Sequence, residues 1–124
     1  GSLKLKEISY IHSEAFQAGE LKHGSISLID KDFGVIAVVT DKEISEKTIS
    51  NLKEVESRGA NIVTITNIKD DDFSKYKILL DDYNEVLNPL MAIIPMQLLA
   101  YNIAKLKGCD IDKPRNLAKS VTVE

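Results

Sequence analysis

An apolar, largely β-branched run at Val35–Thr40 constrains the fold more than any other feature of the chain. Such a run predicts a strand buried on both faces, as in a parallel sheet covered by helices. Asn61–Thr66 predicts a second strand of the same kind. Strand–helix–strand alternation implies a right-handed crossover, so we expect an α/β domain with a parallel sheet. The helix between the two strands is indicated by a stripe at helical spacing: Ile44, Thr48, Leu52 and Val55.

Local signals place the ends of these elements. Asp41 is expected to cap the helix after the first strand, and Gly59 is expected to end it in a left-handed conformation. Asp30–Gly34 predicts a turn and Asp70–Asp72 a loop.

Four further elements are predicted, with a helix at each end of the series. They are a helix over residues 3–13, a short helix at Glu20–Ile29 that is interrupted or bent near Gly24 and Ser25, a third strand at Tyr76–Leu80, and a helix from Asn88 to Lys107. The last helix has Pro89 in its first turn, ends at Gly108, and should bend at Pro95.

Composition excludes several classes of protein. The 124 residues suffice for one domain, and a net charge of -3 without a basic block argues against a nucleic-acid partner. Cys109 is the only cysteine, which predicts no disulfide framework and fits a reducing cytoplasm. The apolar run Leu90–Leu99 is interrupted and too short to cross a bilayer, so no membrane association is expected.

Phosphate and metal motifs are absent from the sequence. The glycines occur singly, so no P-loop or dinucleotide fingerprint can be identified. His12 and His23 are too far apart in sequence to form a local metal pair, and Glu20 with His23 on one helical side lacks a third ligand of fixed spacing. We therefore expect no metal site.

Isolated polar residues remain as candidates. Lys4 and Glu7 share a helix face, and either an ordinary surface ion pair or a functional pair fits that spacing. His23 lies between two glycines and could be a solvated histidine or an acid–base group. Lys119 lies in the closing segment Lys113–Glu124, whose apolar residues predict that the segment docks. Lys119 could be a solvated lysine, or it could deliver an amine to a site formed elsewhere.

Several longer segments resemble one enzyme family. Leu3–His12, Glu14–Phe16, Ala18–Gly24 and Lys113–Glu124 closely resemble the carboxyl-terminal part of the glucosamine-6-phosphate synthase family, the isomerising glutamine:fructose-6-phosphate aminotransferases. Family members carry a glutaminase domain followed by two sugar isomerase (SIS) subdomains. The resemblance implies a three-layer α/β/α SIS-type fold with a parallel sheet, truncated at its amino-terminal end. It divides the chain into a cloning scar at residues 1–2, a partial second SIS subdomain at 3–108 and a tail at 109–124.

The resemblance also implies roles for individual residues. Glu7 would move a proton between C2 and C1 of the sugar, and the charge of Lys4 would keep that carboxylate ionised. His23, contributed by a neighbouring subunit, would help open the sugar ring. Lys119 would form a Schiff base with the open-chain ketose, beside Ala118 in the sugar-binding segment.

The implied reaction converts fructose 6-phosphate and glutamine-derived ammonia to glucosamine 6-phosphate, without a cofactor. The implied partners are the sugar phosphate and a second copy of the chain, in the cytoplasm. Ser25 departs from the proline that the family commonly has after the glycine of the histidine motif. Because the glutaminase and the phosphate-binding loop of the first SIS subdomain are absent, we expect the chain alone to be inactive. A non-catalytic sugar-phosphate-binding SIS module and a fructosamine-deglycase-like enzyme remain as alternatives.

Overall fold

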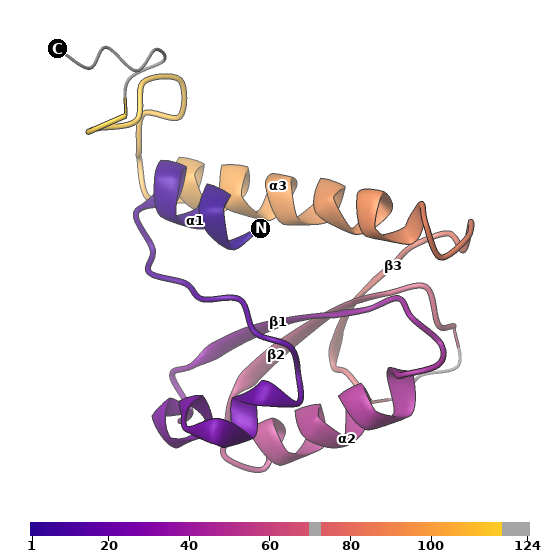
Figure 1. The fold of residues 1–124 in the computed structure, drawn as a ribbon. Helices are drawn as coiled ribbons and strands as arrows, with labels where there is room; N and C mark the ends of the chain where they lie inside the picture. The colour runs from indigo at the N-terminus through magenta and orange to yellow at the C-terminus, as the bar shows by residue number, and fades with distance from the viewer. Residues whose placement is uncertain (70–72, 118–124) are drawn as a thin grey trace, which may run out of the picture. The chain divides into compact units, whose positions relative to one another are not determined.

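A computed structural model describes residues 1–69 and 73–117 (Figure 1). Its contacts divide the chain into two compact units. The first unit combines Gly1–Ala15 with the chain from Met96 onward, and the second unit is Phe16–Pro95. The loop predicted at Asp70–Asp72 and the end of the tail lie outside the described residues.

A three-stranded parallel sheet forms the centre of the second unit. Its strands are β1 (Gly34–Val39), β2 (Asn61–Thr66) and β3 (Tyr76–Leu79), in the order β1-β2-β3. Val35 pairs with Ile62, and Val63 pairs with Tyr76. The α/β class, the parallel sheet and the three predicted strands are therefore confirmed.

Helix α2 (Ser45–Glu56) connects β1 to β2 and packs against both strands (Figure 1). Leu52 and Val55, from the predicted stripe, are 2% and 0% exposed. They belong to an apolar core whose other buried members are Ile29, Ala37, Val39, Ala60 and Ile62. Burying a Leu or Val side chain contributes roughly 1.5–3 kcal/mol, so this core stabilises the crossover.

The prediction that β1 is buried on both faces is wrong. Ala37 and Val39 are buried, but Val38 between them is 39% exposed. Successive side chains of a strand point to opposite faces, and α2 packs on only one of the two. The central strand β2 is the more buried strand, with Thr64, Ile65 and Thr66 all enclosed.

The expected cap of α2 is also wrong, whereas its expected stop is confirmed. The helix begins only at Ser45, and the Asp41 carboxylate instead accepts a hydrogen bond from the Glu43 N–H within a preceding turn. Gly59 has φ +97°, and a Cβ there would lie 3.3 Å from the backbone of Lys31. Only glycine meets both conditions without strain.

The interruption predicted near Gly24 is confirmed. Two single 3₁₀ turns, η1 (Glu20–His23) and η2 (Ser25–Leu28), replace one helix. Gly24 separates them with φ +134°, a conformation that other residues rarely adopt.

Helix α1 (Ser2–Ser9) belongs to the first unit and is shorter than predicted. It ends because Tyr10 adopts a left-handed conformation with φ 55° and ψ 32°. No glycine or proline marks this helix end in the sequence. The periodic pattern therefore predicted a helix that continues to residue 13. The buried Ser9 hydroxyl donates to the Leu5 carbonyl and the Lys107 ammonium donates to the Ser9 carbonyl, joining α1 to the chain after the last helix.

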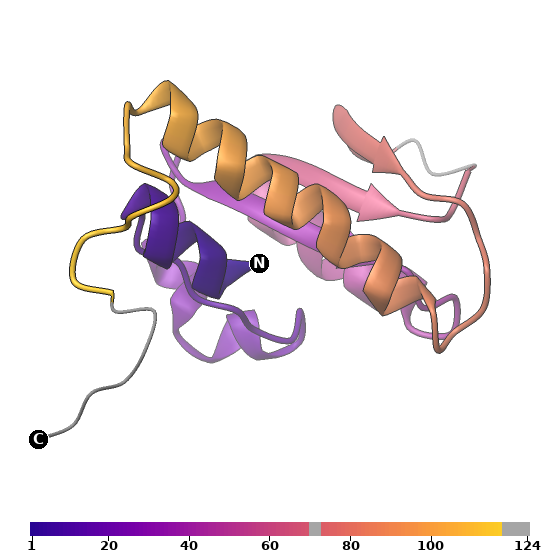
Figure 2. The same cartoon turned by 90° about the horizontal axis from the view of Figure 1, so that it is seen from above.

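Helix α3 (Asn88–Leu106) has Pro95 in its interior and is followed by Gly108 with φ 67°. Its second half lies beside α1 in both views (Figures 1 and 2), where Ala100 and Ala104 are fully buried. By length and composition alone, this 19-residue helix could cross a membrane, so the apolar stretch is longer than the run Leu90–Leu99 indicated. The core helix of a soluble protein passes the same test. A bend at Pro95 stays a prediction.

Candidate active site

Glu7 lies on α1 with Lys4 one helical turn before it. The Lys4 ammonium donates to Oε2 of Glu7 at 2.6 Å, so the predicted shared face is confirmed. The Glu7 side chain is 24% exposed and the Lys4 side chain 50% exposed. Within residues 1–69 and 73–117, this is the one ion pair or hydrogen bond made by the Glu7 carboxylate.

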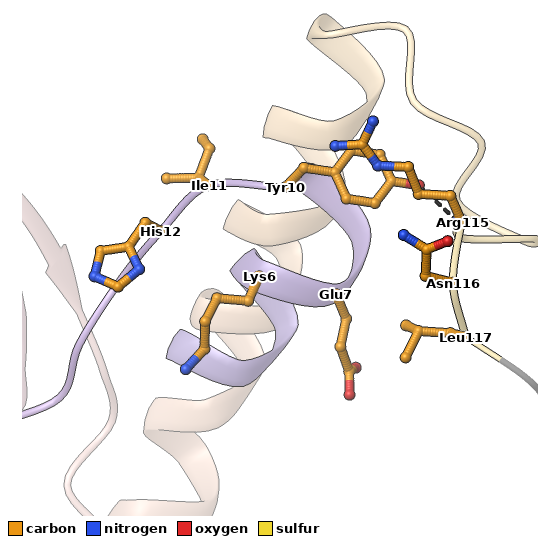
Figure 3. A pocket seen from close by; sticks show the side chains of 8 residues that line it. All are labelled: Lys6, Glu7, Tyr10, Ile11, His12, Arg115, Asn116 and Leu117. Atoms are coloured by element: carbon orange, nitrogen blue, oxygen red, sulfur yellow. Dashed lines mark hydrogen bonds between the residues drawn. The ribbon is translucent and has the colours of Figure 1, made fainter. Parts of the chain in front are cut away.

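An open cavity of about 420 Å³ lies beside Glu7 (Figure 3). Figure 3 shows the Glu7 carboxylate on the side of α1 that faces Asn116 and Leu117. The cavity is therefore lined on one side by α1 and the residues that follow it, and on the other side by residues 115–117 of the closing segment. Its lining residues all belong to the first unit: Lys6, Glu7, Tyr10, Ile11, His12, Arg115, Asn116 and Leu117.

Tyr10 and Arg115 hold the two sides of this cavity together. The Arg115 backbone N–H donates to the Tyr10 hydroxyl at 2.9 Å, and the Arg115 guanidinium lies 4.1 Å from the centre of the Tyr10 ring. Asn116 then adopts a left-handed conformation with φ 61°. Sequence reasoning missed both residues, because no local spacing relates positions so far apart in the chain.

The other predicted site residues are not in this cavity's described lining. His23 is exposed at the end of η1 and belongs to the second unit. Ala118 and Lys119 lie outside the described residues. His12, which was not a predicted site residue, does line the cavity; its side chain is 83% exposed, with Nε2 3.6 Å from Oε1 of Glu14. Of the four predicted catalytic residues, the structure brings together Lys4 and Glu7.

A polar network that the sequence did not predict lies at the carboxyl ends of the strands in the second unit. The Asn67 amide donates to the Thr40 carbonyl and to Oδ1 of Asp82, at 3.3 and 2.8 Å. Asn88, at the start of α3, donates to the same two acceptors, and Lys42 pairs with the other Asp82 oxygen. The hydrogen bond from Lys42, followed by that from Asn88, lowers the pKa of Asp82 below its ordinary value.

Comparison with known proteins identifies the family. A family model described as the SIS domain matches residues 1–106. The chain belongs to this SIS domain family. The carboxyl-terminal domain of the glucosamine-fructose-6-phosphate aminotransferase of Francisella tularensis has the same fold, with a TM-score of 0.82 and 43% identity over 90% of this chain and 32% of that one. A glucosamine-6-phosphate deaminase of Thermotoga maritima matches 98% of this chain and 35% of its own, with a TM-score of 0.78 and 27% identity.

Sequence relatives sharpen the assignment. The isomerizing glutamine–fructose-6-phosphate aminotransferase of Clostridium perfringens is 53% identical over 129 residues, which cover all of this chain. The chain is thus homologous to the carboxyl-terminal SIS region of these aminotransferases, as its terminal motifs predicted. It spans 21% of the length of that relative.

Proposed function

We propose that this chain supplies part of the sugar isomerase site of a glutamine–fructose-6-phosphate aminotransferase. In the intact enzyme, fructose 6-phosphate and ammonia released from glutamine would give glucosamine 6-phosphate. The observation that carries the proposal is the Glu7 carboxylate, set on a cavity whose opposite side is the segment leading to Lys119. The chain alone is expected to lack turnover.

Glu7 is suited to moving a proton between neighbouring carbons. Its Oε2 is held by Lys4, which fixes the carboxylate's orientation on α1. A carboxylate positioned in this way can take a proton from C1 of the ketose-derived intermediate and return it to C2 on the same face. This transfer converts the 2-ketose skeleton to an aldose that carries nitrogen at C2.

Lys119 would condense with the C2 carbonyl of the open-chain sugar and release water. The resulting imine makes C1–H more acidic and is exchanged for the ammonia-derived nitrogen. His23, from the second unit of a neighbouring copy, would exchange the proton needed to open the sugar ring. We propose that the working enzyme is a homodimer that binds a sugar phosphate in the cytoplasm.

Two matched proteins support this substrate class. One is named as an aminotransferase of fructose 6-phosphate, and the other as a deaminase of glucosamine 6-phosphate. Both names place carbon–nitrogen chemistry on a hexose phosphate. A purely binding SIS module would need neither a proton-transfer carboxylate nor an amine opposite it.

The test is Glu7→Gln in a full-length aminotransferase that carries this sequence as its carboxyl-terminal part. We expect sugar isomerisation to fall by about 10²–10⁴-fold, the usual contribution of general acid–base catalysis, while glutamine hydrolysis is largely retained. Glu14→Gln is the matched control, because Glu14 is an exposed carboxylate outside the cavity lining. Wild-type isomerisation in Glu7→Gln would refute the assignment.

A further inference from the structure

Two residues with strained backbone lie on the two sides of the cavity beside Glu7. Among the residues that the structure describes, Tyr10 and Asn116 are the non-glycine residues with positive φ, at 55° and 61°. Both line the cavity of about 420 Å³, Tyr10 at the end of α1 and Asn116 in the closing segment. Left-handed backbone is uncommon outside glycine, and it concentrates where a protein grips a ligand. The strain therefore marks this cavity as a binding site of the first unit.

Asn116 brings a free polar group to this cavity. Its side chain makes no hydrogen bond within residues 1–69 and 73–117. Figure 3 shows the side chain extending from the closing segment toward α1, the helix that carries Glu7. Resting on the proposed function, we propose that Asn116 is a substrate-binding residue. Its amide holds a hydroxyl group of the sugar phosphate beyond the two reacting carbons, on the side of the cavity opposite Glu7.

The other polar groups on this side of α1 already have partners. The Glu7 carboxylate is paired with Lys4, and the Arg115 guanidinium lies 4.1 Å from the centre of the Tyr10 ring. The Asn116 amide is the group that remains for a neutral part of the ligand.

The positions of the remaining lining side chains agree with this assignment. Figure 3 shows Lys6 and His12 on the other side of α1 from Asn116, and Leu117 beside Asn116 is apolar. A side-chain amide offers two N–H donors and one acceptor oxygen, which matches a hydroxyl that both donates and accepts. The cavity is also of a size that holds small molecules, since ligand pockets span roughly 300–1,000 Å³.

Contacts of the preceding residue hold Asn116 in place before any ligand arrives. The Arg115 N–H donates to the Tyr10 hydroxyl at 2.9 Å, which fixes the backbone directly before Asn116. A binding group that is ordered in advance loses less conformational freedom when the ligand binds. The strained conformation of Asn116 is thus maintained by the same pair of residues that joins the two sides of the cavity.

Two substitutions separate the amide from the backbone conformation. Asn116→Gly removes the amide and adopts left-handed backbone freely, whereas Asn116→Ala removes the amide and is strained there. Asn102→Ala is the control, because Asn102 is an exposed asparagine of the same unit outside the cavity.

Binding is measured by equilibrium titration of the full-length aminotransferase with fructose 6-phosphate. The dissociation constant should rise about two- to tenfold in Asn116→Gly, at least as much in Asn116→Ala, and not in the control. The unfolding temperature of Asn116→Gly should equal that of the wild type. Wild-type affinity in Asn116→Gly would overturn the inference, because the backbone conformation alone would then suffice.

Sugar analogues then identify the hydroxyl. The 3-deoxy, 4-deoxy and 5-deoxy forms of fructose 6-phosphate each lack one hydroxyl beyond C1 and C2. One of them should bind the wild type about two- to tenfold more weakly than fructose 6-phosphate does, and this penalty should disappear in Asn116→Gly, where the partner is already gone. If every analogue kept the same penalty in both proteins, the inference would be wrong. A wild-type enzyme that did not bind fructose 6-phosphate at all would instead overturn the proposed function, and this inference with it.

Discussion

The carboxylates of Glu7 and Asp82 are held in opposite ways. Asp82 receives hydrogen bonds from Lys42, Asn67 and Asn88, which come from three different parts of the second unit. Glu7 is paired with Lys4, one turn away on the same helix, and lies on an open cavity. A carboxylate saturated by distant partners stabilises a fold, whereas one with unused acceptor capacity beside a cavity is available for chemistry.

Substitutions around Asp82 and in the core beneath α2 should therefore change stability, and substitution of Glu7 should change activity. The core beneath α2 gives the largest expected effect on stability. Leu52→Ala should lower the free energy of unfolding by about 2–5 kcal/mol, because Leu52 is 2% exposed and its removal leaves a cavity. Urea denaturation of the chain measures the change. Leu106→Ala is the control, since Leu106 is 88% exposed and its loss should change little.

Thr66 offers a smaller test at the carboxyl end of β2. Its buried hydroxyl donates to the Val39 carbonyl at 2.7 Å and accepts from the Ile68 N–H at 3.1 Å. Thr66→Val keeps the shape but leaves both backbone groups without this partner, which should cost about 1–3 kcal/mol. The control is Thr48→Val, because Thr48 is a half-buried threonine of α2. Urea denaturation of both variants gives their losses in the free energy of unfolding. Equal losses would show that the two hydrogen bonds of Thr66 contribute nothing specific.

The lowered pKa of Asp82 predicts a dependence on pH. The unfolded carboxyl takes up its proton near the ordinary pKa of 3.8, and the folded one only at lower pH. Its contribution to stability is therefore complete only well above pH 3.8, and it is lost as the pH falls from there through the lowered pKa. Asp82→Asn should flatten the decline of stability between pH 5 and pH 2, measured by denaturation at each pH. A decline as steep as in the wild type would contradict this account.

The smallest expected effect belongs to the pair on α1. Lys4→Met should change the free energy of unfolding by no more than about 0.5 kcal/mol, because exposed ion pairs one helical turn apart contribute little. In the full-length enzyme the same substitution should lower isomerisation, since it removes the group that orients Glu7. If Lys4→Met lowered the free energy of unfolding as much as Thr66→Val does, Lys4 would have a structural role and this prediction would be wrong.

Sequence patterns predicted the second unit well because its determinants are local or periodic. The apolar run of β1, the stripe of α2 and the glycine at position 59 each carry their own signal. The network around Asp82 escaped prediction, since Lys42, Asn67 and Asn88 meet only after the strands are paired.

The candidate site was predicted mainly by resemblance. Periodicity placed Lys4 and Glu7 on one face but could not choose between a surface pair and a functional one. The Tyr10–Arg115 contact had no signal at all, because the two residues lie at opposite ends of the chain and Tyr10 ends α1 without a glycine. Long-range contacts of this kind follow from the packing of the first unit rather than from local preference.

Borohydride trapping of fructose 6-phosphate on the full-length aminotransferase tests the central claim most directly. Reduction would convert a Schiff base to a stable secondary amine, and mass analysis of the digested protein would locate it. We predict a hexose phosphate adduct on Lys119 that forms in Glu7→Gln as well, because the carboxylate acts after condensation. Substrate binding without an adduct on Lys119, or an adduct on another lysine, would contradict the account.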